Sequence, residues 1–175
     1  MRLTHAASDK KVSQDLNVKR SPLWPKVQED FLKGHPACAA CGAMTKLNVH
    51  HKFPFHYVVL SGRADLEIDP RNLITLCTLP TMEHHILLGH LDNYQSYDPK
   101  VTEMALRYKG KDATEIKADP AFKKAVAGRP TPFERMTAAD KLAFRKTLDR
   151  VLPVNRTLSV QAAHARANLS FRVPA

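Results

Sequence analysis

All three cysteines of this chain and most of its nine histidines lie between residues 38 and 90. The spacing Cys38-x-x-Cys41 lets two thiolates bind one metal ion from a tight turn, and Cys77 and His84 follow downstream. Structural zinc sites take four tetrahedral ligands, commonly thiolates together with an imidazole. We therefore predict a structural zinc site formed by Cys38, Cys41, Cys77 and His84. For Cys77 the alternative is a small buried hydrophobic residue in an apolar strand.

The predicted zinc site would tie the loop at residues 38–41 to the end of a strand and to the first turn of the next helix. Metal binding then contributes directly to folding and substitutes for part of the core of a small domain.

An odd number of cysteines disfavours a disulfide framework and favours a reducing compartment. Residues 1–20 lack the apolar core of a signal peptide, and no run reaches transmembrane length. We therefore expect a cytoplasmic protein with no membrane partner.

The chain is basic, with 27 lysines and arginines against 17 aspartates and glutamates and a formal net charge of +10. Such a balance favours a polyanionic partner, above all nucleic acid, because binding releases counterions from the phosphates. Charge alone does not exclude a basic protein that merely stays soluble. DNA is therefore expected as the partner only if the chain also contains a site that acts on DNA.

Two short strands followed by a helix are predicted around the cysteines and histidines. Residues 46–53 carry Leu47, Val49 and a histidine pair and run into Pro54, which favours a strand. Residues 73–76 are a short apolar run that ends at Cys77, which favours a second strand. Pro80 is placed to begin a helix that continues to about Leu88, and Gly89 is placed to end it. A further helix is predicted over residues 21–33. The predicted fold class is therefore α+β.

The chain divides into three parts by composition. Residues 1–20 are charged and aperiodic, which favours a flexible basic arm. Residues 21–99 hold the cysteines and the histidine pairs, and residues 100–175 are predicted to be a mostly helical extension whose tail, from Asn155, is extended or disordered. The helices predicted in the extension are 101–108, 120–126 and a longer one that is capped by Thr137 and stopped by Pro153.

The chain contains two pairs of adjacent histidines, His50-His51 and His84-His85. In each pair the two histidines can serve two different tasks. Neighbouring side chains of a strand point to opposite faces, so one member of the first pair can bind a metal ion while the other takes a proton from water. Neighbours on a helix are separated by about 100°, so His84 can serve the zinc site and His85 a catalytic ion. A surface patch without function would have to explain the cysteines placed between the pairs.

Four motifs in this order resemble the HNH nucleases of the ββα-metal superfamily. They are Val49-His50-His51, Asp69-Pro70-x-Asn72-Leu73, Leu76-Cys77 and His84-His85-x-x-x-Gly89-His90. The flanking motifs Pro54-Phe55-His56 and Ser96-Tyr97-Asp98-Pro99 resemble a zinc-knuckle subgroup of that family. The resemblance covers about residues 20 to 100. The motifs in this order are a far more specific signal than any one of them.

The resemblance implies a small ββα-metal (His-Me finger) core over residues 21–99, with a structural zinc knuckle and mainly helical N- and C-terminal extensions. It implies a metal-dependent DNA endonuclease that hydrolyses phosphodiester bonds. His51 matches the general base that activates water for attack on the scissile phosphate. Asn72 matches the residue that holds the loop and the base in orientation.

The resemblance also implies which residues bind the catalytic ion. His50 takes the first ligand position, where many members have Asp and the nuclease domains of colicin-type toxins have His. His85 matches the second ligand. His84 stands where relatives usually carry the fourth zinc cysteine, and a histidine there is conservative for zinc. His90 is a further candidate, although five residues from His85 is a worse match to one helical face than four; a chain turn at Gly89 could bring it back.

The expected cofactors are a structural zinc ion and one catalytic divalent cation, Mg, Mn, Ni or Zn. The main alternative is a zinc-stabilised nucleic-acid-binding module without catalysis, against which the joint presence of His51, Asn72 and His85 argues. A metal-storage or metal-sensing protein is disfavoured, because the ordered spacing differs from a simple histidine-rich tract.

Residues 100–175 could supply DNA contacts, a protein-partner surface or a homodimer interface. His56 could face a cleft or serve only in packing, and the setting could be phage packaging, restriction, a toxin or a mobile element.

Overall fold

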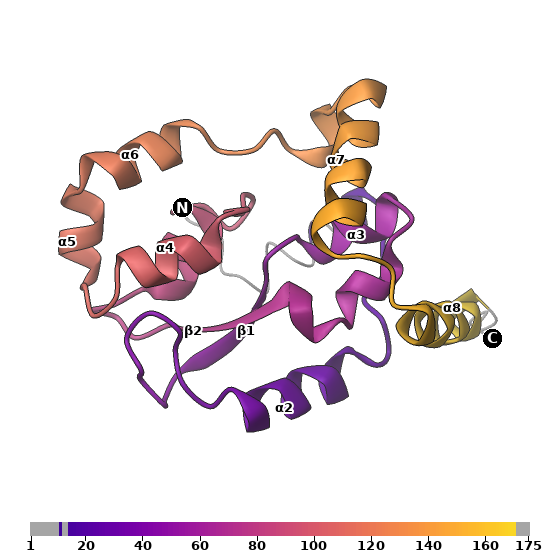
Figure 1. Cartoon of the computed structure of the whole chain (residues 1–175), viewed down its shortest axis with the longest axis horizontal. Helices are drawn as coiled ribbons and strands as arrows, with labels where there is room; N and C mark the ends of the chain where they lie inside the picture. Colours follow the sequence, from indigo (N-terminus) through magenta and orange to yellow (C-terminus); the bar gives the residue numbers. More distant parts are fainter. Residues whose placement is uncertain (1–10, 12–13, 171–175) are drawn as a thin grey trace.

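The computed structural model describes residue 11 and residues 14–170, and the architecture is α+β, as the sequence predicts. Two strands, β1 (Leu47–His51) and β2 (Leu73–Cys77), form an antiparallel sheet with helices around it (Figure 1). Both strands lie inside the segments predicted for them. Among the helices that the structure describes, none combines the length and the apolar character needed to cross a membrane.

The register of the sheet runs from Leu47 opposite Cys77 to His51 opposite Leu73. Every residue of β2 is buried, because the sheet has neighbours on both sides. Helix α2 (Trp24–Gly34) contacts β1, and the helical turn that follows β2 contacts both strands. Fixed pairing therefore places each side chain of β1 on a defined face.

Helix α2 packs against β1 through an apolar face. Its Phe31 lies in a small core with Val49 of β1. The helix begins later than the predicted Ser21, because the Ser21 hydroxyl accepts the N–H of Leu23 at 3.3 Å and forms a turn ahead of the helix. Trp24, the first residue of α2, thereby comes to lie beside β1.

A tight turn precedes β1 and carries the first two cysteines. The N–H of Cys38 donates to the carbonyl of Ala43, and the N–H of Gly42 donates to the carbonyl of Cys38, both at 2.8 Å. Gly42 has a φ of 74°, a left-handed conformation that residues with a Cβ rarely adopt. The N–H of Ala39 donates to the carbonyl of Thr75 at 2.9 Å, which attaches the turn to β2.

The connection between the strands is more regular than the sequence predicts. It contains α3 (Phe55–Leu60) and two short 3₁₀ segments, η1 (Ala64–Glu67) and η2 (Pro70–Asn72). Asp69 caps η2 by accepting the N–H of Arg71 at 2.9 Å. These short segments return the chain to the start of β2.

The segment after β2 departs from the prediction. The helix predicted from Pro80 to about Leu88 begins only at His84, because Glu83 adopts a φ of 49°, and a left-handed residue interrupts a right-handed helix. A π-helical turn, η3 (His85–Gly89), follows, with His84 and His90 at its ends. Its last residue is the glycine that the sequence predicts to end a helix.

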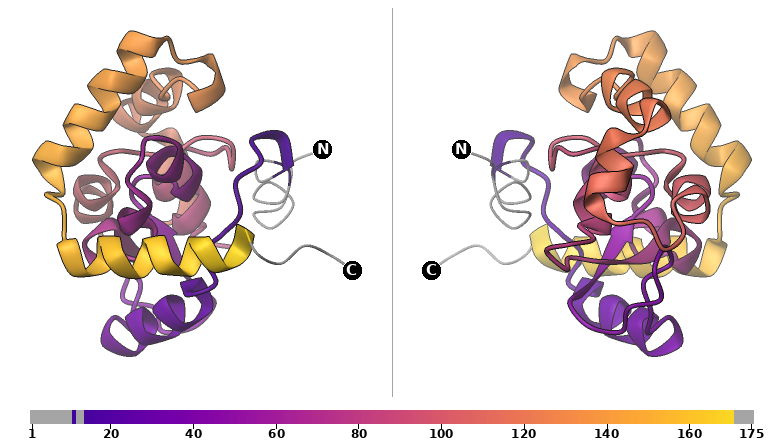
Figure 2. Two further views of the ribbon diagram at one scale, coloured as in Figure 1. Left: turned by 90° about the vertical axis from the view of Figure 1, so that its right-hand side faces the viewer. Right: turned by 90° about the vertical axis from the view of Figure 1, so that its left-hand side faces the viewer.

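The extension after residue 100 is helical, with two corrections to the prediction. One helix, α5, is not predicted, although Asp112 and Glu115 form the capping box that begins it. The predicted extended tail is instead helix α8, which lies against the rest of the chain (Figure 2). Asn155 accepts its first N–H groups, and the buried Ala162 and Ala165 replace the large apolar stripe typical of a packed helix. The helices are α4 (Val101–Arg107), α5 (Ala113–Ala118), α6 (Pro120–Ala127), α7 (Ala138–Val151) and α8 (Arg156–Ser170).

The predicted flexible arm is described only in part, because residues 1–10, 12 and 13 lie outside the described residues. Its end is packed onto the domain rather than flexible. Val18 is buried, and the guanidinium of Arg20 lies 4.0 Å from the centroid of the Phe55 ring. The stacking of Arg20 on this ring fixes the approach of the chain to α2.

A buried arginine connects α7 to the segment between the strands. Arg63 is 1% exposed and pairs with the buried Asp65 at 2.8 Å. It also donates to Asp149 of α7 at 2.7 Å and to the carbonyl of Leu152 at 2.8 Å. Loss of the guanidinium would leave a buried carboxylate without its partner, which is costly in a low-dielectric interior.

We predict that Arg63→Ala lowers the free energy of unfolding by about 3–5 kcal/mol, the usual cost of breaking a buried ion pair from one side. Urea denaturation followed by circular dichroism measures this change. Lys26→Ala is the matched control, because it breaks the exposed pair of Lys26 with Asp30 and should cost less than about 0.5 kcal/mol. Equal stability of the two variants would contradict the role of Arg63.

Candidate active site and metal centre

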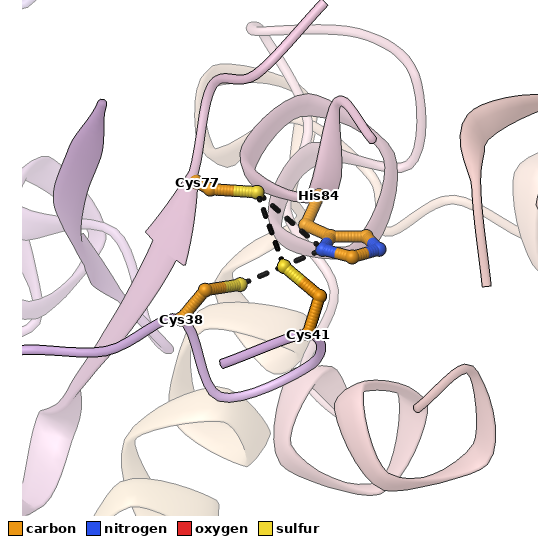
Figure 3. Close-up of side chains that lie close together, drawn as sticks. All are labelled: Cys38, Cys41, Cys77 and His84. Atoms are coloured by element: carbon orange, nitrogen blue, oxygen red, sulfur yellow. Dashed lines mark hydrogen bonds between the residues drawn. The ribbon is translucent and has the colours of Figure 1, made fainter. Parts of the chain in front are cut away.

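Three cysteines and one histidine converge beside the end of β2 (Figure 3). The Nδ1 atom of His84 lies 3.5 Å from the Sγ atoms of both Cys38 and Cys77, and the Sγ atoms of Cys41 and Cys77 are 3.7 Å apart. All four ligand atoms lie within 4.8 Å of one another. The group could hold a metal ion such as zinc, and its members are those that the sequence predicts.

The orientation of His84 is fixed from outside the group. Its Nε2 atom lies 2.8 Å from the carbonyl oxygen of Lys111. A carbonyl can only accept, so Nε2 carries the hydrogen and the lone pair of Nδ1 faces the sulfur atoms. Such a partner on the second nitrogen is usual for a metal-binding histidine. Because Lys111 precedes α5, this bond also ties the helical extension to the cysteine group.

The protons of this group are shared unequally. Hydrogen bonding to Cys77 and His84 outweighs burial and lowers the pKa of Cys38 to about 3. The same bond to Cys38, together with burial, raises the pKa of Cys77, and burial raises the pKa of Cys41. Burial opposes the charged form of His84, but its bonds to Cys38 and to the Lys111 carbonyl outweigh burial and raise its pKa. Cys38 is therefore the first thiolate, and the thiolate is the form that binds metal.

A second group of candidate ligands consists of His50, His85 and His90, all of them buried. Their ligand nitrogen atoms lie within 4.8 Å of one another. The ring centroids are 5.3 Å apart for His50 and His85, 4.7 Å for His50 and His90, and 4.9 Å for His85 and His90. Imidazole is a common ligand of zinc and of other divalent transition metals. The structure thus brings together the three histidines predicted from the sequence.

The π-helical turn η3 explains how His85 and His90 reach one site. An α-helix aligns residues three and four apart, which made His90 a poor match in the sequence. A π-helical turn is closed by i→i+5 hydrogen bonds, so residues five apart lie above one another. Turns of this kind are frequent at functional sites. The chain therefore does not need to swing back at Gly89.

The loop after η3 supports the histidine group. The Nδ1 atom of His90 lies 2.8 Å from the carbonyl oxygen of Ser96, so Nδ1 carries the hydrogen and Nε2 faces the group. The N–H of Asp98 donates to the carbonyl of Gly89 at 3.0 Å. Gly89 itself lies against the ring of His50, since a Cβ at this position would come within 2.9 Å of that ring. A glycine is needed here for close approach rather than for a turn.

His51 points away from the histidine group and toward the segment between the strands. Its Nε2 atom lies 2.9 Å from the backbone carbonyl oxygen of Glu67, so Nε2 carries the hydrogen. Its Nδ1 atom faces a guanidinium nitrogen of Arg20 at 3.5 Å. The ring of Trp24 lies 4.3 Å from the His51 ring, centroid to centroid. The ring is thus held in one tautomer and one orientation.

Asn72 joins the two segments that flank His51. Its amide oxygen accepts the N–H of Phe53 at 2.9 Å. Its amide nitrogen donates to the carbonyls of Phe53 and Leu66, at 3.0 and 2.9 Å. The side chain is fully buried. These contacts hold Phe53, two residues after His51, close to Leu66.

One cleft, with a volume of about 250 Å³, is lined by two members of the histidine group and by His51. His50, His51, His56 and His90 are among the residues that line it, and the His56 ring also packs against Phe55 and Tyr57. The cleft carries a positive charge from Arg20, which lies over the Phe55 ring. The residues that line it are Arg20, Trp24, Gln28, Asn48, Val49, His50, His51, Pro54, Phe55, His56, Tyr57, His90, Tyr94, Gln95, Ser96 and Tyr97.

Three contributions to the site are not predicted from the sequence. Arg20 is assigned there to a solvated arm, and only the aromatic residues near it in space fix its position. Glu67 and Ser96 contribute through backbone carbonyls, which leave no signal in side-chain identity. The Ser96-Tyr97-Asp98-Pro99 motif marks the loop, but not the contact that the loop makes.

Comparisons of the chain with protein-family models, with curated proteins and with solved structures found no match. The assignment of a function therefore depends on the geometry and chemistry of the two residue groups.

We predict that Gly89→Ala weakens the binding of Ni²⁺ to the histidine group by about 10- to 100-fold, the usual effect of displacing a ligand or its support. The new methyl group would push the His50 ring out of position. Isothermal titration of the zinc-loaded protein with Ni²⁺ measures the affinity. Gly34→Ala is the control, because a Cβ there meets no atom within 4 Å. Wild-type affinity in a folded Gly89→Ala protein would exclude His50 as a ligand.

Proposed function

We propose that this chain is a metal-dependent DNA endonuclease of HNH type, with His51 as the general base. The observation that carries the proposal is that His51 opens onto the same cleft as two histidines of the candidate ligand group, His50 and His90. A base beside a metal group in one cleft suits metal-assisted hydrolysis of a phosphodiester. The order of β1, β2 and the helical turn η3 also supports the ββα-metal core that the resemblance implies.

In this proposal His50, His85 and His90 hold one divalent ion. The ion would supply positive charge that stabilises the negative charge developing on the phosphate and its leaving oxygen. The chain holds His90 through the Ser96 carbonyl and places His50 against the small Gly89. The Cys38, Cys41, Cys77 and His84 group would hold a structural zinc ion and contribute to folding.

His51 accepts a proton from the attacking water at Nδ1. The hydrogen bond from Nε2 to the Glu67 carbonyl keeps Nδ1 unprotonated and stabilises the imidazolium that forms. Arg20, whose guanidinium faces Nδ1 at 3.5 Å, would turn to the substrate phosphate and so expose Nδ1 to the water. The contacts of Asn72 keep the loop that follows His51 in place. Histidine suits this task because its ordinary pKa lies close to neutral pH.

Arg20 is the residue of the cleft best placed to bind a phosphate. Its guanidinium is stacked on the Phe55 ring and lies 4.9 Å from the centroid of the Trp24 ring. Stacking orients the plane of the guanidinium, whose edge can donate two parallel hydrogen bonds to phosphate oxygens. A phosphate held there would lie next to His51. The net charge of +10 supports a polyanionic substrate in the same way.

We predict that the purified chain nicks or cuts plasmid DNA only when a divalent cation is present, and that His51→Ala removes this activity. Without the base, the rate should fall by at least about 100-fold, the lower range for loss of general base catalysis. Gel electrophoresis of plasmid incubated with Mg²⁺, Mn²⁺, Ni²⁺ or Zn²⁺ measures the rate. His164→Ala is the control, because it removes an exposed histidine of α8 that does not line the cleft.

Two outcomes of this experiment would overturn the proposal. Normal cutting by His51→Ala would exclude His51 as the base. No cutting by the wild-type chain with any of the four cations, while it still retards DNA in a gel, would instead favour the zinc-stabilised binding module. Retained DNA binding by an inactive His51→Ala protein is the result that the endonuclease proposal requires.

A further inference from the structure

We propose that Arg166 of helix α8 is a positioning residue, which holds the general base His51 in orientation through Glu67. This inference rests on the endonuclease function proposed above. It assigns a role in the reaction to a helix that lies outside the residues covered by the HNH resemblance. The connection consists of two contacts, one at each end of Glu67.

The carboxylate of Glu67 is fully buried and is held by two partners. The backbone N–H of Ser21 donates to one of its oxygens at 2.8 Å, and the guanidinium of Arg166 pairs with the other. Burial raises the pKa of Glu67, and the Ser21 N–H and Arg166 lower it in part. Arg166 is 20% exposed, so the ion pair lies mostly inside the protein. A buried carboxylate of this kind needs its countercharge.

The backbone carbonyl of the same residue accepts the Nε2 hydrogen of His51 at 2.9 Å. Glu67 is the last residue of the 3₁₀ segment η1, so the buried ion pair of its side chain with Arg166 ties the end of η1 to helix α8. Helix α8 lies against η1. A shift of the Glu67 carboxylate would therefore also move the carbonyl that orients His51.

Arg166 also contacts the segment that faces the other side of the His51 ring. It donates a hydrogen bond to the backbone carbonyl of Lys19 at 3.1 Å. Lys19 and Ser21 flank Arg20, whose guanidinium faces Nδ1 of His51. Arg166 thus contacts the residue before Arg20 directly and the residue after it through Glu67. The two nitrogen atoms of the His51 ring face the Glu67 carbonyl and the Arg20 guanidinium. Arg166 contacts the backbone or side chain next to both of these groups.

Removal of the Arg166 side chain would leave Glu67 buried with the Ser21 N–H alone. The carboxyl group would then take up a proton or turn toward water, and either change would release η1 from its present position. We expect Arg166→Ala to lower kcat by about 10- to 100-fold, as is usual for residues that orient a catalytic group, while KM for DNA changes by less than about threefold. Arg166→Lys, which restores the positive charge, should recover part of kcat.

The matched control is Arg145→Ala on helix α7. Arg145 also donates to a backbone carbonyl, that of Ser61 at 2.6 Å, and also pairs with a carboxylate, that of Asp149 at 2.9 Å. It has no contact with Glu67 or with the residues around Arg20. A merely structural role of arginines in the extension would give both variants the same effect.

The decisive readout is independent of cleavage. The ¹⁵N chemical shifts of the His51 ring, measured at one pH on the zinc-loaded chain, report which nitrogen carries the hydrogen. We expect the Nε2–H form in the wild type and in Arg145→Ala, and a mixture of the two forms in Arg166→Ala. If Arg166→Ala does not fold, Glu67→Gln combined with Arg166→Ala leaves no unpaired buried charge and allows the same measurement.

Wild-type ring shifts in a folded Arg166→Ala protein would overturn the inference. Altered ring shifts together with a 10- to 100-fold loss of kcat would support it. If Arg166→Ala alters the ring shifts but the wild-type chain cuts no DNA, Arg166 still orients His51 and only the endonuclease function is refuted. The two proposals therefore fail separately.

Discussion

The antiparallel pairing of β1 with β2 is the constraint on which both candidate metal sites depend. Each strand contributes to a site through one end or one face. Cys77, the last residue of β2, brings the strand to the cysteine turn, while His50 and His51 of β1 point to opposite sides. Slippage by one residue would exchange the faces of His50 and His51 and separate the base from the cleft. Backbone hydrogen bonds between two five-residue strands therefore determine where the two candidate metal groups and His51 lie.

The turn after β2 divides its two adjacent histidines between the sites. His84 faces the cysteines and is fixed by the Lys111 carbonyl, whereas His85 joins His50 and His90. The left-handed Glu83 starts this segment late, and the π-helical turn then aligns His85 with His90. The cysteine group thus fixes the segment that carries two of the three clustered histidines, so the predicted structural zinc would also stabilise the geometry of the candidate catalytic site.

Local patterns predict much of this arrangement. Ligand spacing identified the cysteine group, and the resemblance to HNH nucleases identified the histidine group. Apolar residues bounded by turn signals indicated the strands, and the capping residue Thr137 identified the start of α7. The patterns fail where the cause is backbone conformation or distant packing. No side-chain pattern predicts a left-handed Glu83 or a π-helical turn, and the alanines of α8 lack the apolar stripe of a typical packed helix. Glu67 orients His51 through its backbone and is held by a residue 99 positions away, and such a contact exists only in three dimensions.

The most direct test of this account is anomalous X-ray scattering from crystals of the full chain soaked in zinc, with data collected on both sides of the zinc absorption edge. The account predicts one anomalous peak among Cys38, Cys41, Cys77 and His84 and a second among His50, His85 and His90. A peak at the cysteine group alone, with none at the histidines, would contradict a catalytic metal site beside His51 and leave the chain with a structural zinc ion only.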